Sequence, residues 1–167
     1  MNSLLLLASR AACTILAVTV LMPQMGAQPQ AVTRFKGAFD GKYTATVEGA
    51  TLRGTGGGAG TATLVGPFTY TEKATVDLPT GMTGAGSFQF VLANGDTITA
   101  VLVGRAVPDV PKGNSFVGLY TITGGTGKFQ RATGSFTVQR YFDDSNIPAF
   151  SLGWSHFEGI IDAPGLK

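Results

Sequence analysis

The sequence predicts an all-β fold, an eight-stranded antiparallel β-barrel that closes on itself. Thr, Val, Phe and Tyr dominate the chain from Lys42 onward, and these residue types suit a pleated, half-buried surface. Gly and Pro clusters interrupt these runs at short intervals, as turns do. No stretch combines the apolar period of a helix with helix-capping residues. The predicted strands cover residues 42–52, 59–66, 67–78, 85–93, 96–107, 115–123, 132–142 and 149–161.

Closure of the barrel follows from the short connections between these strands. An open antiparallel sheet would leave two unpaired edges, and closure removes both. A barrel of eight strands has an interior that side chains fill or that holds one small ligand. A two-sheet sandwich is the alternative arrangement. Asn94-Gly95 predicts a hairpin turn because this pair tolerates positive φ at both positions, and Gly66-Pro67 predicts a sharp bend.

Residues 1–27 are predicted to be a secretory signal peptide. Arg10 is their only charge, and the apolar run that follows it is shorter than the roughly 20 residues that span a bilayer. The small-residue exit at Gly26-Ala27 completes the pattern. A retained membrane anchor is the alternative. Cys13 does not suggest lipid attachment, because it begins the apolar run instead of ending it.

The remainder is expected to form a linker over residues 28–40 and a single barrel domain over residues 41–167. This organisation predicts a secreted or periplasmic protein without a stable membrane anchor. Removal of the signal peptide takes away one of the 12 basic residues and none of the 10 acidic ones, which leaves a net charge of +1. Such a balance creates no field that would attract nucleic acid or an anionic membrane.

Neither a metal site nor a cofactor site is expected. Cys13 is the only cysteine and His156 the only histidine, so the mature part lacks thiolate ligands and a second imidazole. The glycine-rich residues 54–60 precede no helix that could hold a phosphate, and they are expected to form a flexible hairpin loop. Residues 124–128 contain a Gly-Lys pair, but Phe129 follows it where a phosphate loop needs Ser or Thr.

Alternation along the strands places four charged or titratable residues on predicted interior faces. The even positions of 67–78, 132–142 and 149–161 are mainly apolar, which marks them as the interior by the period of two. These positions also carry the candidate catalytic residues Glu72, Arg140, His156 and Glu158. The candidate substrate-binding aromatics of the same interior are Tyr43, Tyr70, Tyr120, Phe136 and Trp154.

Buried charges need partners, and Arg140 can take a carboxylate in a bidentate manner. Glu158 is the favoured partner because the two residues lie on consecutive predicted strands. Glu72 or His156 would then remain as a proton donor or acceptor with a perturbed pKa. The alternative is that these groups lie at a wet barrel mouth or form a structural ion pair.

Residues 121–134 resemble a segment of known protein families. This segment, Thr-Ile-Thr-Gly-Gly-Thr-Gly-Lys-Phe-Gln-Arg-Ala-Thr-Gly, is similar to a turn of dirigent proteins and allene oxide cyclases. The closing segment 157–161 resembles bacterial secreted proteins of the allene oxide cyclase barrel-like group. Only the turn glycines and Phe129 match, and Phe129 is expected to plug one barrel end. No catalytic residue transfers to this chain.

The resemblance implies an eight-stranded barrel with a hydrophobic central pocket, often assembled as a trimer. It also implies chemistry without a cofactor, either cyclisation of a lipid epoxide or steering of phenolic radical coupling. The first hypothesis is therefore a cofactor-free isomerase, cyclase or dirigent-like protein that binds a small hydrophobic or phenolic molecule. A non-catalytic binder of such a molecule and a structural or interaction module with a filled barrel are the alternatives.

Overall fold

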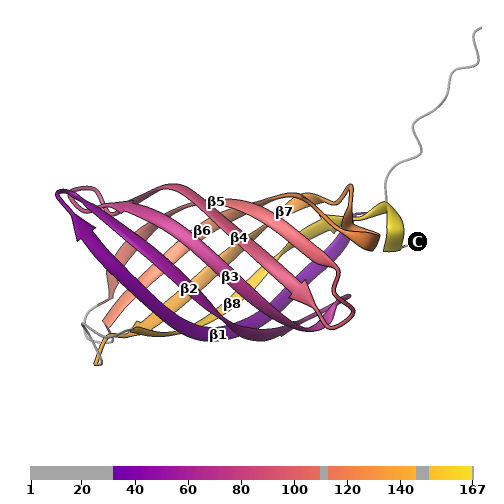
Figure 1. Ribbon diagram of the computed structural model, residues 1–167, viewed down its shortest axis with the longest axis horizontal. Coiled ribbons are helices and arrows are strands. Elements are labelled where there is room, and N and C mark those ends of the chain that lie inside the picture. Colours follow the sequence, from indigo (N-terminus) through magenta and orange to yellow (C-terminus); the bar gives the residue numbers. More distant parts are fainter. Residues whose placement is uncertain (1–31, 110–112, 146–150, 167) are drawn as a thin grey trace, which may run out of the picture.

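The computed structural model describes residues 32–109, 113–145 and 151–166, in which eight strands close into a barrel (Figure 1). Consecutive strands pair antiparallel, and the last pairs with the first. The predicted fold class is thus confirmed over the two-sheet sandwich, while the predicted signal peptide lies outside the described residues. The elements are β1 (Thr33–Glu48), β2 (Thr51–Ala62), β3 (Gly66–Asp77), β4 (Met82–Leu92), β5 (Thr97–Asp109), β6 (Gly113–Gly125), η1 (Gly127–Phe129), β7 (Thr133–Asp143), β8 (Ser151–Asp162) and η2 (Pro164–Leu166).

The two ends of the barrel differ (Figure 1). One end holds the short 3-10 helices η1 and η2, and the side chains of Phe129, Ala132 and Ala163 are buried there. The expected plugging of one end by Phe129 is confirmed. The opposite end holds the turns from β1 to β2 and from β3 to β4.

The first strand begins inside the segment predicted as a linker, residues 28–40. Phe35 and Phe39 are buried and alternate with exposed neighbours, so this part of the chain already has one face in the core. The strand ends before Gly49, which turns the chain with a φ of +62°. The predicted strand 42–52 is therefore divided between β1 and β2.

The glycine-rich residues 54–60 form the middle of β2, and the predicted flexible loop is wrong. Glycine usually weakens a strand, but here its missing side chain makes room for aromatic rings. A Cβ atom on Gly56 would lie 2.2 Å from the Tyr43 ring, and one on Gly60 would lie 2.7 Å from the Phe68 ring. The glycines that pair with inward-facing residues of β1 are Gly54, Gly56, Gly58 and Gly60.

Two predicted turns occur close to their expected places. Asn94-Gly95 joins β4 to β5, although only Gly95 adopts a positive φ, of +84°. The bend expected at Gly66-Pro67 occurs just before these two residues, at Leu64, which has a φ of +73°. Gly66, with a φ of +70°, then opens β3.

Aromatic rings fill the half of the barrel near η1. They pack mostly edge to face or tilted, with neighbouring ring centroids between 4.7 and 6.5 Å apart. This half of the interior is therefore closely packed. The rings come from Phe35, Phe39, Phe68, Phe88, Phe90, Phe136 and Phe157.

A comparison of two glycines of β2 tests the need for space. A Cβ on Gly58 would lie 1.9 Å from the carbonyl oxygen of Asp40, whereas one on Gly54 would lie 3.8 Å from the Leu52 side chain. We expect Gly58→Ala to lower the free energy of unfolding by about 2 kcal/mol. Gly54→Ala should change it by less than about 0.5 kcal/mol. Urea denaturation measures both, and equal losses would contradict this account of the strand.

Candidate functional site

Three strands present the predicted residues to the interior. Tyr70 and Glu72 of β3, Tyr120 of β6, and Phe136 and Arg140 of β7 are all buried. They come from strands whose alternation is regular, so the period of two identified the correct face. Tyr43 of β1 also faces inward and is half-buried.

The strand β8 has the opposite orientation to the one predicted. Trp154, His156 and Glu158 lie on the outer face and are exposed, while Ser155 and Phe157 are buried. The predicted interior positions of the candidate catalytic residues His156 and Glu158 and of the candidate substrate-binding residue Trp154 are therefore wrong.

The physical reason is the space beside β8, which larger side chains already occupy. A Cβ on Gly153 would lie 2.6 Å from the Tyr43 ring, and one on Gly159 would lie 2.7 Å from Cβ of Phe136. Only small residues fit at these two inward positions, so the set of alternate residues that contains Trp154 and Glu158 faces outward. Apolar Trp154 on the outer face is what misled the alternation rule.

Arg140 forms its ion pair with Glu72, and the predicted pair with Glu158 is wrong. Nη1 donates to Oε1 of Glu72 at 3.0 Å and Nη2 donates to Oε2 at 2.7 Å, a bidentate geometry. The two side chains are only 3% and 6% exposed. Nε of Arg140 donates to Oγ of Ser155 at 2.9 Å, and Tyr120 lies within 3.4 Å of both charged groups.

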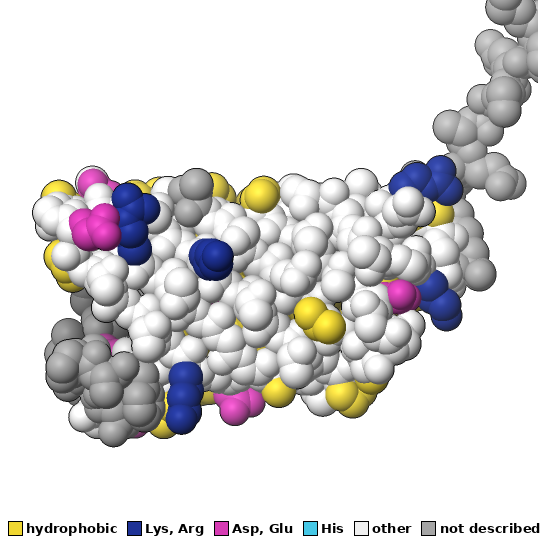
Figure 2. All heavy atoms as spheres, in the orientation of Figure 1, with side chains coloured by type: hydrophobic (Ala, Val, Ile, Leu, Met, Phe, Trp, Pro, Cys, Tyr) yellow, Lys and Arg dark blue, Asp and Glu magenta, His cyan; other side chains and the backbone are white. Residues whose placement is uncertain are grey.

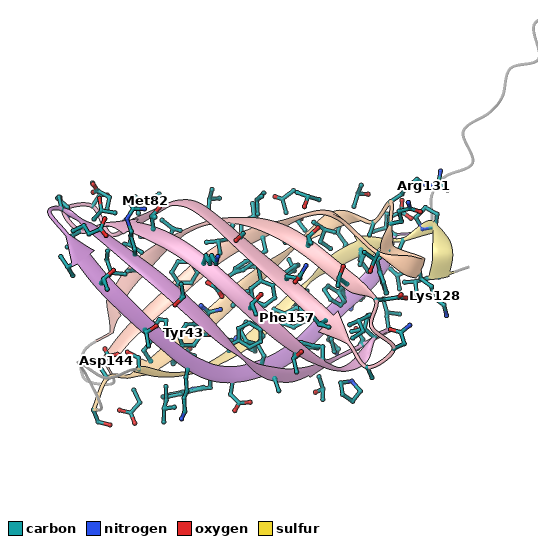
Figure 3. The ribbon with its side chains drawn as sticks, viewed as in Figure 1. Tyr43, Met82, Lys128, Arg131, Asp144 and Phe157 are labelled. Carbon is teal, nitrogen blue, oxygen red and sulfur yellow. The ribbon has the colours of Figure 1, made fainter. Side chains whose placement is uncertain are left out.

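Aromatic rings enclose the guanidinium. Its central carbon lies 4.7 Å from the Tyr43 ring centroid, 5.3 Å from that of Phe39, and 5.9 Å from those of Phe116 and Phe142. Such contacts favour the cation electrostatically where water is excluded. The Tyr43 and Tyr70 hydroxyls are hydrogen-bonded to each other beside this cluster. Figure 3 shows Phe157 deeper in the barrel and Tyr43 nearer the end that bears Asp144.

A pocket of about 790 Å³ occupies the end of the barrel opposite η1 and η2. This volume lies within the range of roughly 300–1,000 Å³ typical of small-molecule sites. Tyr43, Glu72 and Arg140 lie at its inner end, where the packed aromatic core begins. The apolar lining includes Leu52, Ala74, Val76, Leu78, Pro79 and Phe116.

Sequence reasoning missed three residues of this region. Phe39 lay in the predicted linker, although its spacing from Phe35 was a usable signal. Ser155 would have required the pairing register, which sets it opposite Arg140. Thr83 is buried and lines the pocket because the register shifts between Thr83 and Gly86, which no local pattern announces.

Burial determines the protonation of the tyrosines. Loss of hydration raises the pKa values of Tyr43, Tyr70 and Tyr120, because the charged phenolate is the form that burial disfavours. Burial by itself would lower the pKa of Arg140, but the Glu72 carboxylate outweighs it and the net shift is upward. The inner end of the pocket therefore combines neutral phenols with a compensated cation.

The described part of the chain contains no group of three or more His, Cys, Asp and Glu side chains placed to hold a metal ion. None of its helices has the length and apolar character needed to cross a membrane.

Comparison with known proteins finds a structural likeness. No family model matches the sequence, and no curated protein matches it. A solved structure of a pterocarpan synthase dirigent protein is similar, with a TM-score of 0.45 and 13% sequence identity over 81% of this chain and 88% of that chain. The barrel itself is established by the strand pairing.

Removal of one partner tests the buried ion pair. Glu72→Gln leaves the Arg140 guanidinium buried without a counter-charge, and we expect the free energy of unfolding to fall by about 3–5 kcal/mol. The double variant Glu72→Leu with Arg140→Met should recover most of this loss. Glu48→Gln, which breaks the exposed pair with Arg53, should cost less than about 1 kcal/mol. Equal stability of Glu72→Gln and Glu48→Gln in urea would show that the buried pair of Arg140 and Glu72 stabilises the barrel no more than the exposed pair of Arg53 and Glu48.

Alkaline pH should destabilise the barrel through its buried tyrosines. Above a pH of about 10 an unfolded tyrosine loses its proton, whereas the folded state retains it because the pKa is raised. The unfolded state then binds fewer protons, so the free energy of unfolding falls as pH rises. The stability that the buried neutral tyrosines contribute is fully present below about pH 10. Urea denaturation at stepped pH should show this decline. In Tyr120→Phe the slope should be shallower by up to about 1.4 kcal/mol per pH unit, and an unchanged slope would exclude Tyr120 as a contributor.

Proposed function

We propose that the barrel binds a small, neutral, mainly apolar molecule whose hydroxyl or carbonyl group reaches the inner end of the pocket. The observation that carries this proposal is the combination of an apolar-lined pocket with a buried ion pair and tyrosine hydroxyls at its inner end. A filled barrel would offer no such space. The solid aromatic half supplies a rigid base for the pocket instead.

The lining determines the kind of molecule that fits. Leu52, Val76, Leu78 and Phe116 offer hydrocarbon surface to most of a guest. Burial of such surface contributes roughly 25 cal/mol per Å² and needs no specific geometry. The body of the guest is therefore hydrocarbon, aliphatic or aromatic.

The inner end determines the polar group of the guest. Arg140 and Glu72 neutralise each other, so a charged guest would find no counter-ion there and would lose its hydration. Tyr43 is half-buried and lines the pocket, and its hydroxyl can both donate and accept a hydrogen bond. A neutral hydroxyl, phenol or carbonyl satisfies these conditions.

The geometry favours binding and orientation of the guest over acid–base catalysis. Both carboxylate oxygens of Glu72 accept hydrogen bonds from Arg140, so protonation of Glu72 would break the ion pair. His156, the other residue predicted as a proton donor or acceptor, faces the outside. We infer a non-catalytic binder, or a protein that orients a reactive phenolic guest without transferring protons. Secretion and homo-oligomer formation remain predictions from the sequence.

Titration with two rigid neutral probes tests the proposal. We expect 4-hydroxystilbene to bind about fivefold more tightly than trans-stilbene, because one neutral hydrogen bond contributes about 1 kcal/mol. Ala74→Phe, which places a ring in the pocket, should weaken binding of both at least tenfold in isothermal titration calorimetry. Lys73→Phe, on the exposed face of the same strand, is the matched control and should bind as the wild type does.

Two results would reject the proposal. One is the absence of binding of either stilbene to the wild-type protein. The other is equal affinity of the wild-type protein and a folded Ala74→Phe variant, which would place the bound probe outside the pocket.

A further inference from the structure

The outer face of β7 and β8 carries a cluster of aromatic rings that the pocket does not use. The Tyr141 and Trp154 centroids lie 6.0 Å apart with ring planes 20° from parallel, and the Tyr141 and His156 centroids lie 6.4 Å apart with planes 32° from parallel. Tyr141 and Trp154 are directly opposite each other in the sheet. We refer to Tyr141, Trp154 and His156 as the aromatic platform.

Tyr141 and Trp154 stack on each other, and the His156 ring is tilted against the Tyr141 ring. Centroid distances of 6.0 and 6.4 Å lie toward the long end of the range for aromatic pairs, so the rings overlap only in part and part of the Trp154 ring remains exposed. Trp154 is accordingly 50% exposed. Its ring contributes nothing to the barrel core, which lies on the opposite face of β8.

Hydrogen-bonding side chains border the platform. Asp40 of β1 lies opposite Trp154 and is exposed, and Gln139 of β7 lies opposite His156. Nε2 of Gln139 donates to the Tyr141 hydroxyl at 2.6 Å, which fixes the orientation of that ring. The rings thus have carboxylate, amide and imidazole groups at their edges.

This composition differs from the aliphatic patch on β5 and β6. There the exposed side chains are Val101, Val103, Val117 and Leu119, which offer no hydrogen bonds. No histidine is visible on the barrel face in Figure 2, so exposed His156 and the platform lie outside that view. Open aromatic faces with polar edges therefore distinguish the platform from an ordinary apolar surface.

We propose that the aromatic platform is a saccharide-binding site. The C–H faces of a pyranose ring pack against open aromatic faces, while its hydroxyls exchange hydrogen bonds with side chains at the edges. Asp40, Gln139 and His156 supply acceptors and donors of this kind.

Trp154 is the only tryptophan in the chain, so its fluorescence reports on this site alone. The wild-type protein should be titrated with cellohexaose, laminarihexaose, chitohexaose and maltohexaose. We expect a saturable change in tryptophan emission with at least one of them. Unchanged emission with all four at millimolar concentration would overturn the proposal.

Four variants, with affinities measured by calorimetry, locate the bound saccharide. Tyr141→Ala and His156→Ala should each weaken binding, the first at least tenfold. Leu152→Ala removes an exposed apolar side chain from the same face of β8 and should stay within twofold of the wild type. The pocket variant Ala74→Phe should also bind the saccharide normally. Wild-type affinity in folded Tyr141→Ala and His156→Ala variants would overturn the assignment, whatever the outcome for the pocket.

Discussion

The ion pair between Arg140 and Glu72 is the interaction on which the interior of this barrel depends. Two opposite charges that are almost completely shielded from water are tolerable only with good geometry and further hydrogen bonds. Ser155 and Tyr120 supply the additional bonds, and the aromatic rings around the guanidinium exclude water from it. The pair lies where the packed core gives way to the pocket, so the same contacts close the core and form the inner end of the binding space.

The interior combines very large residues with very small ones. Aromatic rings from β1, β3, β4, β7 and β8 fill one half, and the glycines of β2 and β8 leave room for rings that cross from other strands. The absence of side chains at Gly56 and Gly153 leaves room for the two sides of the Tyr43 ring. This ring lies against the Arg140 guanidinium. Close packing of this kind makes the position of the pocket a property of the whole barrel and not of any one strand.

The barrel separates two chemical surfaces that the sequence interleaves. Along β8, Ser155 and Phe157 belong to the interior while Trp154 and His156 belong to the outside, so residues adjacent in sequence serve different surfaces. The interior surface is suited to a neutral apolar guest. The outer platform combines open aromatic faces with hydrogen-bonding groups, and a ligand on it would have no contact with the pocket.

The sequence alone determined the all-β class, the closed barrel, and the inward faces of β3, β6 and β7. Each of these follows from a local pattern, because strands alternate with a period of two and Tyr70, Tyr120 and Arg140 lie in regular runs. Only the tertiary structure decided that Glu72 is the partner of Arg140, that residues 54–60 are strand, and that Trp154 and His156 face outward. The reason is physical: Arg140 and Glu72 are 68 residues apart and meet across the barrel. Whether a glycine or a tryptophan fits inside depends on rings contributed by distant strands, which no local pattern contains.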